Sequence, residues 1–597
     1  MNSIQILKDS ISKLLKHPYA NTKYIALANI LTMYIFIPLL RKLALALMKI
    51  SGITYISYDN IFTVFKNVPL FSIIFIVLFI FILILLYIQF YIIIITMQYI
   101  RNDKYISSTK LLTSTVFAIS CLSPTKLLFT FFYLLIFVPL AGFSFYTKLL
   151  ANVRIPDFIM EFITTTNSIY PIVLGLFYIL VLYVAIRLVL VLPLMMLENI
   201  KLKKAINISL KYTKKKLFFY LKNYILIFVT LSFAMTSIYF ILLAIQLGFD
   251  NYLPSFAYNS SLIIIFIMQG FNYFYWLVGV YLTFSVFFNQ IEEYNLLAPL
   301  LNTSSFFNNN VKLSSETIFI TFFTIISLFS LFTYNSMYLQ NVLNSKPLSI
   351  SHRGISNKKG VENTIQSFNK AIKYKPDYVE IDIQLTKDDK FVVYHDKTLK
   401  GLTNKSTEVS SLTLEQLTNT TIKQNNYKTT ISDFDSYLEN ANKHKQKLLI
   451  EFKLYDSDPK HFVNLFLDKY QKNIITNNHQ IQSLSYDALN YLNQKNRTIP
   501  AGYIMILEVL GQPKDIVDFY TLEYSTLNKR FIDEIHANNK KVYAWTVSDE
   551  ESMSGLMFQN IDGIVTTDLK TLQETIDGFY SQNSYSKKLL YYIIGQS

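Results

Sequence analysis

The stretch from Ser351 to Asp396 holds the side chains best suited to chemistry. Two histidines, His352 and His395, stand near its ends, and between them lie two carboxylates, Glu380 and Asp382. The carboxylates are two residues apart in the alternating run VEIDI, and residues two apart on a strand point to the same side. Parallel acids repel each other and attract a cation, and paired carboxylate oxygens are the ligands that Ca²⁺ or Mg²⁺ prefers. The spacing therefore predicts a divalent metal flanked by two imidazoles.

Eight short motifs in this half of the chain resemble, in the same order, those of the glycerophosphodiester phosphodiesterase family. They are HRG, ENT, EIDIQLTKD and YHD, followed by IEFK at 450–453, QS at 482–483, WTV at 545–547 and DGIVTTD at 562–568. The resemblance covers about residues 348–575. It implies an enzyme that hydrolyses glycerophosphodiesters to an alcohol and glycerol phosphate in a metal-dependent (β/α)8 barrel.

The resemblance also implies roles for particular residues. His352 and His395 are the expected catalytic groups, and Glu380, Asp382 and Glu451 are the expected metal ligands. The expected contacts to phosphate or substrate are Arg353, Lys453, Glu362, Asn363, Gln482 and Trp545. Two loops depart from the family pattern: Val361 stands where the family usually has proline, and Lys400 to Thr403 replaces a common Arg-Thr. The second departure bears on substrate preference.

The chemistry follows from these residue types. A phosphodiester carries one negative charge, so a metal together with Arg353 and Lys453 would neutralise the charge that grows in the transition state. The resemblance implies that one imidazole deprotonates an attacking hydroxyl and the other protonates the leaving alcohol, because an imidazole titrates near neutral pH. The sequence leaves open which histidine has which role. Two further histidines, His444 and His479, fit no motif and are expected at the surface.

Short strands separated by amphipathic helices begin at Leu348, which predicts βα units and a parallel sheet. Eight such units predict a TIM-type (β/α)8 barrel with its active site at the carboxyl ends of the strands. The run from Phe391 to His395 is predicted as a hairpin partner of the second strand. The candidate strands are 348–353, 378–384, 447–453, 478–484, 499–505, 519–523, 541–547 and 563–567.

The first 340 residues hold apolar runs near twenty residues long, which is the length that crosses about 30 Å of hydrocarbon. They predict an all-α polytopic membrane domain of about seven transmembrane helices. Residues 3–16 place Ile4, Leu7, Ile11 and Leu14 on one face and read as an interfacial helix. The candidate spans are 24–46, 70–98, 127–147, 169–196, 223–247, 261–288 and 316–340.

Lysines between the spans predict the orientation. The 197–222 loop holds eight lysines and the 248–260 loop holds none, so the positive-inside rule places the first in the cytoplasm. After seven crossings the catalytic half is expected outside the cell membrane. The predicted division is a membrane domain at 1–340, a linker at 341–347, the barrel at 348–580 and a tail at 581–597.

Composition limits the partners. The formal net charge of +15 is concentrated beside apolar spans, so it indicates membrane topology rather than nucleic-acid binding. A single cysteine, Cys121, excludes an internal disulfide framework and a thiolate metal cluster. Expected partners are membrane lipids and a glycerophosphodiester, a lipid-headgroup diester or a glycerophosphate polymer of the envelope. The alternatives are a phospholipase D-like lipid hydrolase of the same fold and a transporter or receptor whose barrel only binds.

Overall fold

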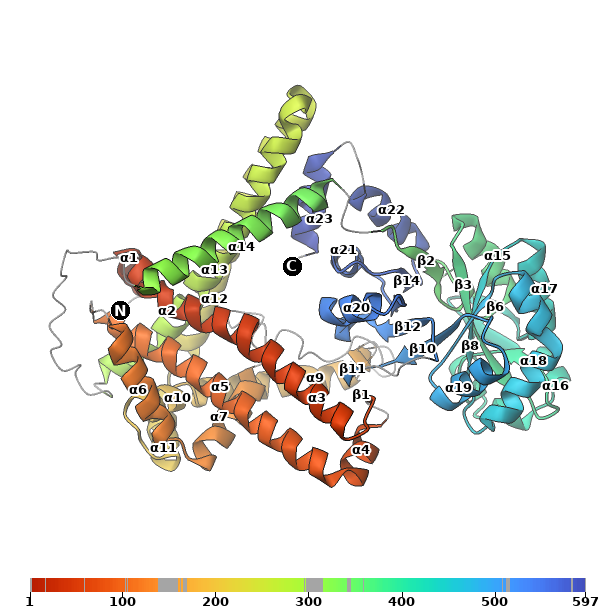
Figure 1. The fold of residues 1–597 in the computed structure, drawn as a ribbon, viewed down its shortest axis with the longest axis horizontal. Coiled ribbons are helices and arrows are strands. Elements are labelled where there is room, and N and C mark those ends of the chain that lie inside the picture. The colour runs from red at the N-terminus through yellow and green to blue at the C-terminus, as the bar shows by residue number, and fades with distance from the viewer. Residues whose placement is uncertain are drawn as a thin grey trace. The chain divides into compact units, whose positions relative to one another are not determined.

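The 597-residue chain forms two compact units, each considered by itself (Figure 1). The helical unit holds residues 1–52, 65–245 and 263–330, and the barrel unit holds residues 53–64, 246–262 and 331–597. Three short stretches of the predicted membrane half therefore belong to the barrel unit. The computed structural model describes residues 3–16, 18–57, 60–102, 104, 106–137, 159–160, 163–164, 169–294, 296, 315–340, 345–357, 359–506, 508–511, 516–580 and 584–595.

Helices account for nearly all of the described part of residues 1–340. Long apolar runs without a polar face form helices that satisfy their own backbone, which is what a bilayer requires. The principal helices are α1 (Ser3–Lys16), α2 (Pro18–Leu31), α3 (Ile37–Ile50), α4 (Ile61–Asn67), α5 (Pro69–Arg101), α6 (Ser108–Ser120), α7 (Pro124–Phe137), α9 (Ile169–Arg187), α10 (Val191–Leu197), α11 (Leu202–Thr213), α12 (Leu217–Tyr252), α13 (Ala257–Glu293) and α14 (Ser315–Leu339).

Within the described residues, four helical segments are long and apolar enough to cross a membrane, and the bent pair α6 and α7 gives a fifth. The sequence predicts seven. The first predicted span is not among them, because α2 and α3 are only 14 residues long each and are joined by a π-helical turn at Thr32–Phe36. The second half of the third span, 138–147, lies outside the described residues. The four segments are Pro69–Arg101, Ile169–Leu197, Leu217–Tyr252 and Pro254–Glu293.

Helix α1 confirms the predicted N-terminal helix but buries a different face. Ile6, Ser10 and Leu14 are buried, whereas Ile4 is 54% exposed. The buried residues recur every four positions and so form one stripe, which faces the neighbouring helices α2 and α5. The stripe that packs is centred on Ser10, and Ile4, at one end of the predicted apolar face, stays exposed, as a helix at a membrane interface allows.

The barrel unit contains eight parallel strands that close on themselves, as predicted. The sheet runs in the order β2, β14, β13, β12, β10, β9, β8, β3, and β2 also pairs with β3. The antiparallel strand β4 (Phe391–Val393) follows β3 as the predicted hairpin partner. The parallel strands are β2 (Leu348–Ser351), β3 (Tyr378–Leu385), β8 (Leu448–Phe452), β9 (Gln480–Ser483), β10 (Ala501–Met505), β12 (Phe519–Glu523), β13 (Lys541–Trp545) and β14 (Gly563–Thr566).

Helices connect these strands, and the local sequence sets where they begin. Asp458 caps α18 (Pro459–Thr476), Ser485 caps α19 (Tyr486–Lys495) and Asp568 caps α22 (Leu569–Phe579). Each cap accepts a hydrogen bond from a backbone N–H of the first turn, which stabilises a helix by about 1 kcal/mol. The remaining helices are α15 (Ile365–Ala371), α16 (Leu414–Thr418), α17 (Phe434–Lys443), α20 (Lys529–His536), α21 (Glu550–Phe558) and α23 (Tyr585–Ile594).

Large apolar side chains fill the barrel interior. Ile350, Leu449, Phe519 and Tyr543 belong to one buried cluster. Gly502 on β10 is required there, because a Cβ at this position would lie 1.9 Å from the Phe519 ring. The filled interior leaves the carboxyl ends of the strands as the place where polar groups can gather.

Candidate active site

The sequence His352-Arg353-Gly354 forms a tight turn where β2 ends. Arg353 has φ 49° and Gly354 has φ +65°, both in the left-handed region. A Cβ on Gly354 would lie 2.7 Å from the Tyr437 hydroxyl, so only glycine fits. The turn aims the Arg353 backbone N–H at Glu380 Oε2, 2.7 Å away. The turn therefore fixes one of the two predicted acids.

Three carboxylates meet at the carboxyl ends of β3 and β8. Asp382 and Glu451 are register partners on these adjacent strands, and Glu380 lies two residues before Asp382. Each offers an oxygen within 4.8 Å of the other two, and their exposed fractions are 2%, 1% and 7% for Glu380, Asp382 and Glu451. This acid trio is the set predicted as metal ligands, and the structure brings all three together.

Two cations lie against the acid trio. Lys453 Nζ is 3.4 Å from Asp382 Oδ1 and 2.5 Å from Glu451 Oε1. Arg353 Nε is 3.7 Å from Asp382 Oδ2, and Arg353 Nη1 lies 2.8 Å from Glu362 Oε1. Ionised, the acid trio and Glu362 carry two more charges than the two cations offset. Buried carboxylate oxygens that carry two uncompensated negative charges fit a hard divalent cation.

The pKa values of Glu380 and Asp382 are shifted in opposite directions. Burial raises the pKa of Glu380, and the charges of Asp382 and Glu451 raise it further. Burial also acts on Asp382, but His395 and Lys453 outweigh it and lower the pKa of Asp382. Asp382 is thus the permanently charged member, while an added cation would favour ionisation of Glu380.

His352 follows β2 and reaches the same mouth. Its ring is partly exposed, and its Nδ1 lies 3.5 Å from Thr546 Oγ1. Burial lowers the pKa of His352, and the charge of Arg353 lowers it further. The ring is therefore neutral near pH 7 and has a lone pair with which to accept a proton.

The loop after β4 positions His395 through its backbone and its ring. His395 Nδ1 lies 2.7 Å from Asp396 Oδ1. Gln384 Nε2 donates to the carbonyls of Tyr394 at 2.7 Å and Asp396 at 2.9 Å. The Tyr455 hydroxyl donates to the carbonyl between them, that of His395. Three consecutive carbonyls are thus held by side chains from β3 and from the loop after β8, which fixes the direction of the ring.

Comparison with known proteins identifies the architecture. The model of the membrane domain of glycerophosphoryl diester phosphodiesterase matches residues 7–337, more than half of the chain, and the glycerophosphoryl diester phosphodiesterase family model matches residues 352–571. The chain belongs to the glycerophosphodiester phosphodiesterase family. It is an enzyme of that family, a phosphoric diester hydrolase that carries a membrane domain.

Two curated relatives agree with this assignment. YhdW of Bacillus subtilis, named for the same activity, is 29% identical over 36% of this chain and 93% of its own length. A glycerophosphodiester phosphodiesterase of Caldanaerobacter subterraneus is 27% identical over 38% of this chain and 96% of its own. A solved phosphodiesterase of Oleispira antarctica, in complex with sn-glycerol-3-phosphate, is 21% identical, with a TM-score of 0.34, over 39% of this chain and 97% of that one.

Glu362 and Asn363 of the enzyme are engaged with other protein groups. Glu362 pairs with Arg353, and Gln424 on the β5 (Thr421–Gln424) hairpin donates to Glu362 Oε2 at 2.8 Å. Asn363 Nδ2 donates to Asp382 Oδ2 at 2.8 Å, and the Asp382 N–H donates back to Asn363 Oδ1 at 3.2 Å. These contacts orient Arg353 and Asp382.

Gln482 and Trp545 complete the predicted set. Gln482 is the register partner of Glu451, is buried, and accepts a hydrogen bond from Thr521 Oγ1 at 2.9 Å. Trp545 ends β13 and packs partly buried against the interior cluster. Gln482 therefore extends the row of Asp382 and Glu451, while Trp545 forms part of the wall.

Sequence reasoning missed the groups that hold His395. The role of Gln384 could have been predicted, because this residue continues the alternation of Glu380 and Asp382 on β3 and so lies on the same side. The role of Tyr455 could not, since it lies in an irregular loop without a sequence pattern. The surface prediction for His479 is wrong: this residue is 1% exposed, and its ring is satisfied inside the fold, where Nδ1 accepts the backbone N–H of Leu448 at 2.9 Å. His444 is exposed, as predicted.

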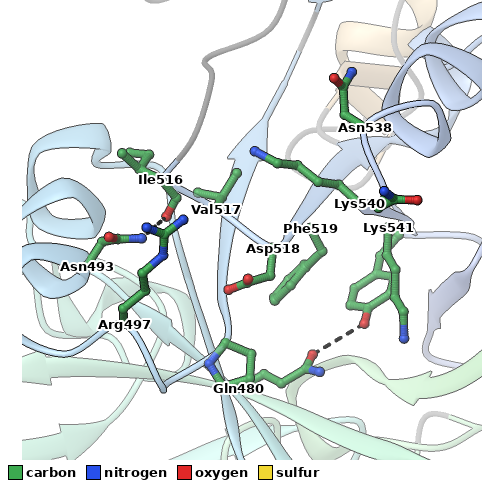
Figure 2. A pocket seen from close by; sticks show the side chains of 13 residues that line it. Gln480, Asn493, Arg497, Ile516, Val517, Asp518, Phe519, Asn538, Lys540 and Lys541 are labelled. Atoms are coloured by element: carbon green, nitrogen blue, oxygen red, sulfur yellow. Dashed lines mark hydrogen bonds between the residues drawn. The ribbon is translucent and has the colours of Figure 1, made fainter.

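Two cavities lie at opposite ends of the barrel. One of about 240 Å³ is lined by Gln384, Lys453 and Tyr455, among other residues. The other, of about 450 Å³, lies at the amino ends of β9, β12 and β13, where Figure 2 shows Gln480, Arg497 and Lys540 around it. None of the predicted site residues lines the second cavity.

Proposed function

We propose that this enzyme hydrolyses glycerophosphodiesters to glycerol phosphate and an alcohol, at the mouth of its barrel. The observation that carries the proposal is the convergence of His352, His395 and the acid trio from four strands, β2, β3, β4 and β8. A barrel that only binds has no need of two imidazoles beside three buried acids, since unpaired buried charge destabilises a fold.

The side chains divide the work as follows. His352, neutral and partly exposed, accepts a proton from the attacking water as the water oxygen forms the new P–O bond. His395, held by Asp396 at Nδ1, presents Nε2 to the leaving oxygen and donates a proton as the old P–O bond breaks. Arg353 and Lys453 face the phosphoryl oxygens and offset their growing charge. The cavity of about 240 Å³ beside Lys453 has room for a small alcohol.

The acid trio would hold Ca²⁺ or Mg²⁺ through its carboxylate oxygens, which are the donors hard cations prefer. Such an ion polarises a phosphoryl oxygen and lowers the pKa of a bound hydroxyl. Lys453 lies against Asp382 and Glu451, so it keeps part of the acid trio neutralised whatever the metal content.

We further propose seven spans with the barrel outside the cell membrane. The stretches that belong to the barrel unit are 53–64, 246–262 and the end of α14, and the seven-span scheme places all three on one side. The lysine-rich loop at 197–222 belongs to the helical unit and falls on the other side. Substrates would then be membrane-proximal: lipid-headgroup diesters or glycerophosphate polymers of the envelope.

The test of function is turnover of glycerophosphoglycerol by the purified full chain and by two variants. His352→Ala and His395→Ala should each lower kcat by at least about a hundredfold, the usual contribution of general acid–base catalysis. His444→Ala, at an exposed position away from the site, is the matched control and should retain wild-type turnover. Near wild-type turnover in either active-site variant would remove that histidine from the mechanism.

A further inference from the structure

A strand from the membrane half of the chain pairs with a loop of the barrel. Strand β1 (Tyr55–Ser57) lies in sequence between α3 and α5, yet it belongs to the barrel unit. It runs antiparallel to β11 (Glu508–Gly511), with Tyr55 opposite Gly511 and Ile56 opposite Leu510 (Figure 1). The pairing joins segments very far apart in sequence, so it closes a long loop and needs further contacts to persist.

Side chains of β1 supply such contacts. The Tyr55 ring lies 6.1 Å from the Tyr486 ring and 6.2 Å from the Tyr503 ring, and these two rings are themselves 5.9 Å apart. Ile56 is fully buried. Aromatic pairs at these distances contribute about 0.5–1.5 kcal/mol each beyond their buried area. Strand β1 is therefore attached through both its backbone and its side chains.

The partner strand lies at the rim of the active-site mouth. Strand β11 follows β10, so it leaves the carboxyl end of a barrel strand, the end where the catalytic groups lie. Around the barrel β10 stands four places from β2, whose end carries His352. The loop that β1 holds thus borders the mouth across from that histidine, where a substrate arm extending past the acid trio would pass.

The chain that follows β1 within the barrel unit is apolar and leads to the membrane helix α5. Phe62, in α4, is 83% exposed. The connection from Ser57 to Pro69, where α5 begins, reaches at most about 30 Å when extended outside its short helix. Exposed apolar side chains on such a tether are suited to the acyl chain of a lipid.

We propose that β1 is a specificity element of the active site, which holds β11 at the rim and so favours diesters carried by a lipid over soluble ones. The inference rests on the proposed phosphodiesterase activity. A soluble diester needs only the acid trio, the cations and the histidines. A lipid-borne diester has an acylated arm that crosses the rim, where a fixed loop positions it and a loose loop does not.

The test breaks the strand and compares two substrates. Ile56→Pro removes a backbone N–H and the buried side chain, so it should prevent pairing. The full chain in phosphatidylcholine vesicles is assayed for phosphomonoester formation from lysophosphatidylglycerol and from soluble glycerophosphoglycerol. The ratio of the two kcat/KM values should fall by about tenfold or more, as expected when positioning contacts to one substrate are lost. Thr63→Ala, exposed in the same segment, should leave the ratio unchanged.

A second variant locks the strand in place. In a Cys121→Ser background, Ile56→Cys with Leu510→Cys should form a disulfide on oxidation, and the locked enzyme should keep the wild-type ratio. An equal loss of both substrates in Ile56→Pro, or an unchanged ratio, overturns the specificity role. A wild-type enzyme inactive on both substrates refutes the proposed function instead, so the two failures are distinguishable.

Discussion

At the scale of single residues, the acid trio and the two cations beside it form one charge system. Asp382 is the group that Arg353 and Lys453 share, and its carboxylate also accepts from Asn363. A buried ion pair loses stability when one partner is removed, because the other charge is left uncompensated. The site therefore combines a fixed negative charge at Asp382 with acids whose ionisation depends on an added cation.

This charge system predicts metal dependence. Chelation should abolish turnover of glycerophosphoglycerol, and Ca²⁺ or Mg²⁺ should restore it, because carboxylate oxygens prefer hard cations. Zn²⁺ should restore less. Asp382→Asn keeps the shape but removes the charge, so it should raise the half-saturating metal concentration by at least about tenfold. Full activity in excess chelator would contradict the site.

The support of His395 predicts a positioning role for Gln384. Gln384→Met keeps the volume but removes the donor to two backbone carbonyls, so kcat should fall by about tenfold while KM changes little. Gln384→Asn should recover part of the loss. The half-saturating metal concentration serves as the control readout, because a general structural defect would change it together with kcat.

At the scale of elements, the sequence predicted those features that depend on neighbouring residues in the chain, such as the positions of strands. Alternation and turn residues placed all eight barrel strands to within a few residues, and the two-residue spacing of Glu380 and Asp382 correctly put both acids on one side. Local pattern does not report which surface another element covers. His479 looked like a surface residue because its burial comes from Asn442 and Leu448, which belong to other elements.

The burial of His479 links the packing of β8 and β9 to pH. Burial lowers the pKa of His479 to about 4, below the usual value of 6.5. Above pH 7 the ring is neutral in both the folded and unfolded chain. Below pH 6.5 the unfolded chain binds a proton that the folded chain does not. The free energy of unfolding therefore decreases as the pH is lowered, by about 2 kcal/mol at pH 5.

Thermal inactivation of the solubilised full chain at pH 7, 6 and 5 checks this linkage. His479→Gln should be less stable at pH 7, since it disturbs the bond to Leu448, but its inactivation temperature should depend less on pH than that of the wild type. His444→Gln, at the exposed histidine, is the matched control and should keep the wild-type pH dependence. Equal pH dependence in all three proteins would exclude His479 as the source.

At the scale of the whole molecule, the sequence pattern could not predict how the barrel unit is completed. Strand β1 is only three residues long, which is too short for an alternating pattern to predict it. The predicted tail contains helix α23, whose Ser586 N–H donates to Asp250 at 2.8 Å, while Tyr338 donates to the Lys588 carbonyl at 2.7 Å. Both features depend on contacts between residues far apart in the chain, which a local pattern does not contain.

These contacts bear on topology. Asp250 lies at the tip between α12 and α13, Tyr338 lies near the end of α14, and β1 precedes α5. All three belong to the unit that contains the barrel, so they should share its side of the membrane. In the seven-span scheme these positions fall on the side opposite to the lysine-rich 197–222 loop, which the positive-inside rule predicts to be cytoplasmic.

A cysteine placed on each side tests the orientation. In a Cys121→Ser background, Asn425→Cys lies in the exposed turn between β5 and β6 (Tyr427–Thr430), and Lys214→Cys lies in the lysine-rich loop. On intact cells an impermeant maleimide should label the first and spare the second, and after permeabilisation it should label both. The reverse pattern on intact cells would place the barrel in the cytoplasm. The first predicted span, which α2, the π-helical turn and α3 form, would then not cross the membrane, and the substrates would be cytoplasmic diesters rather than those of the envelope.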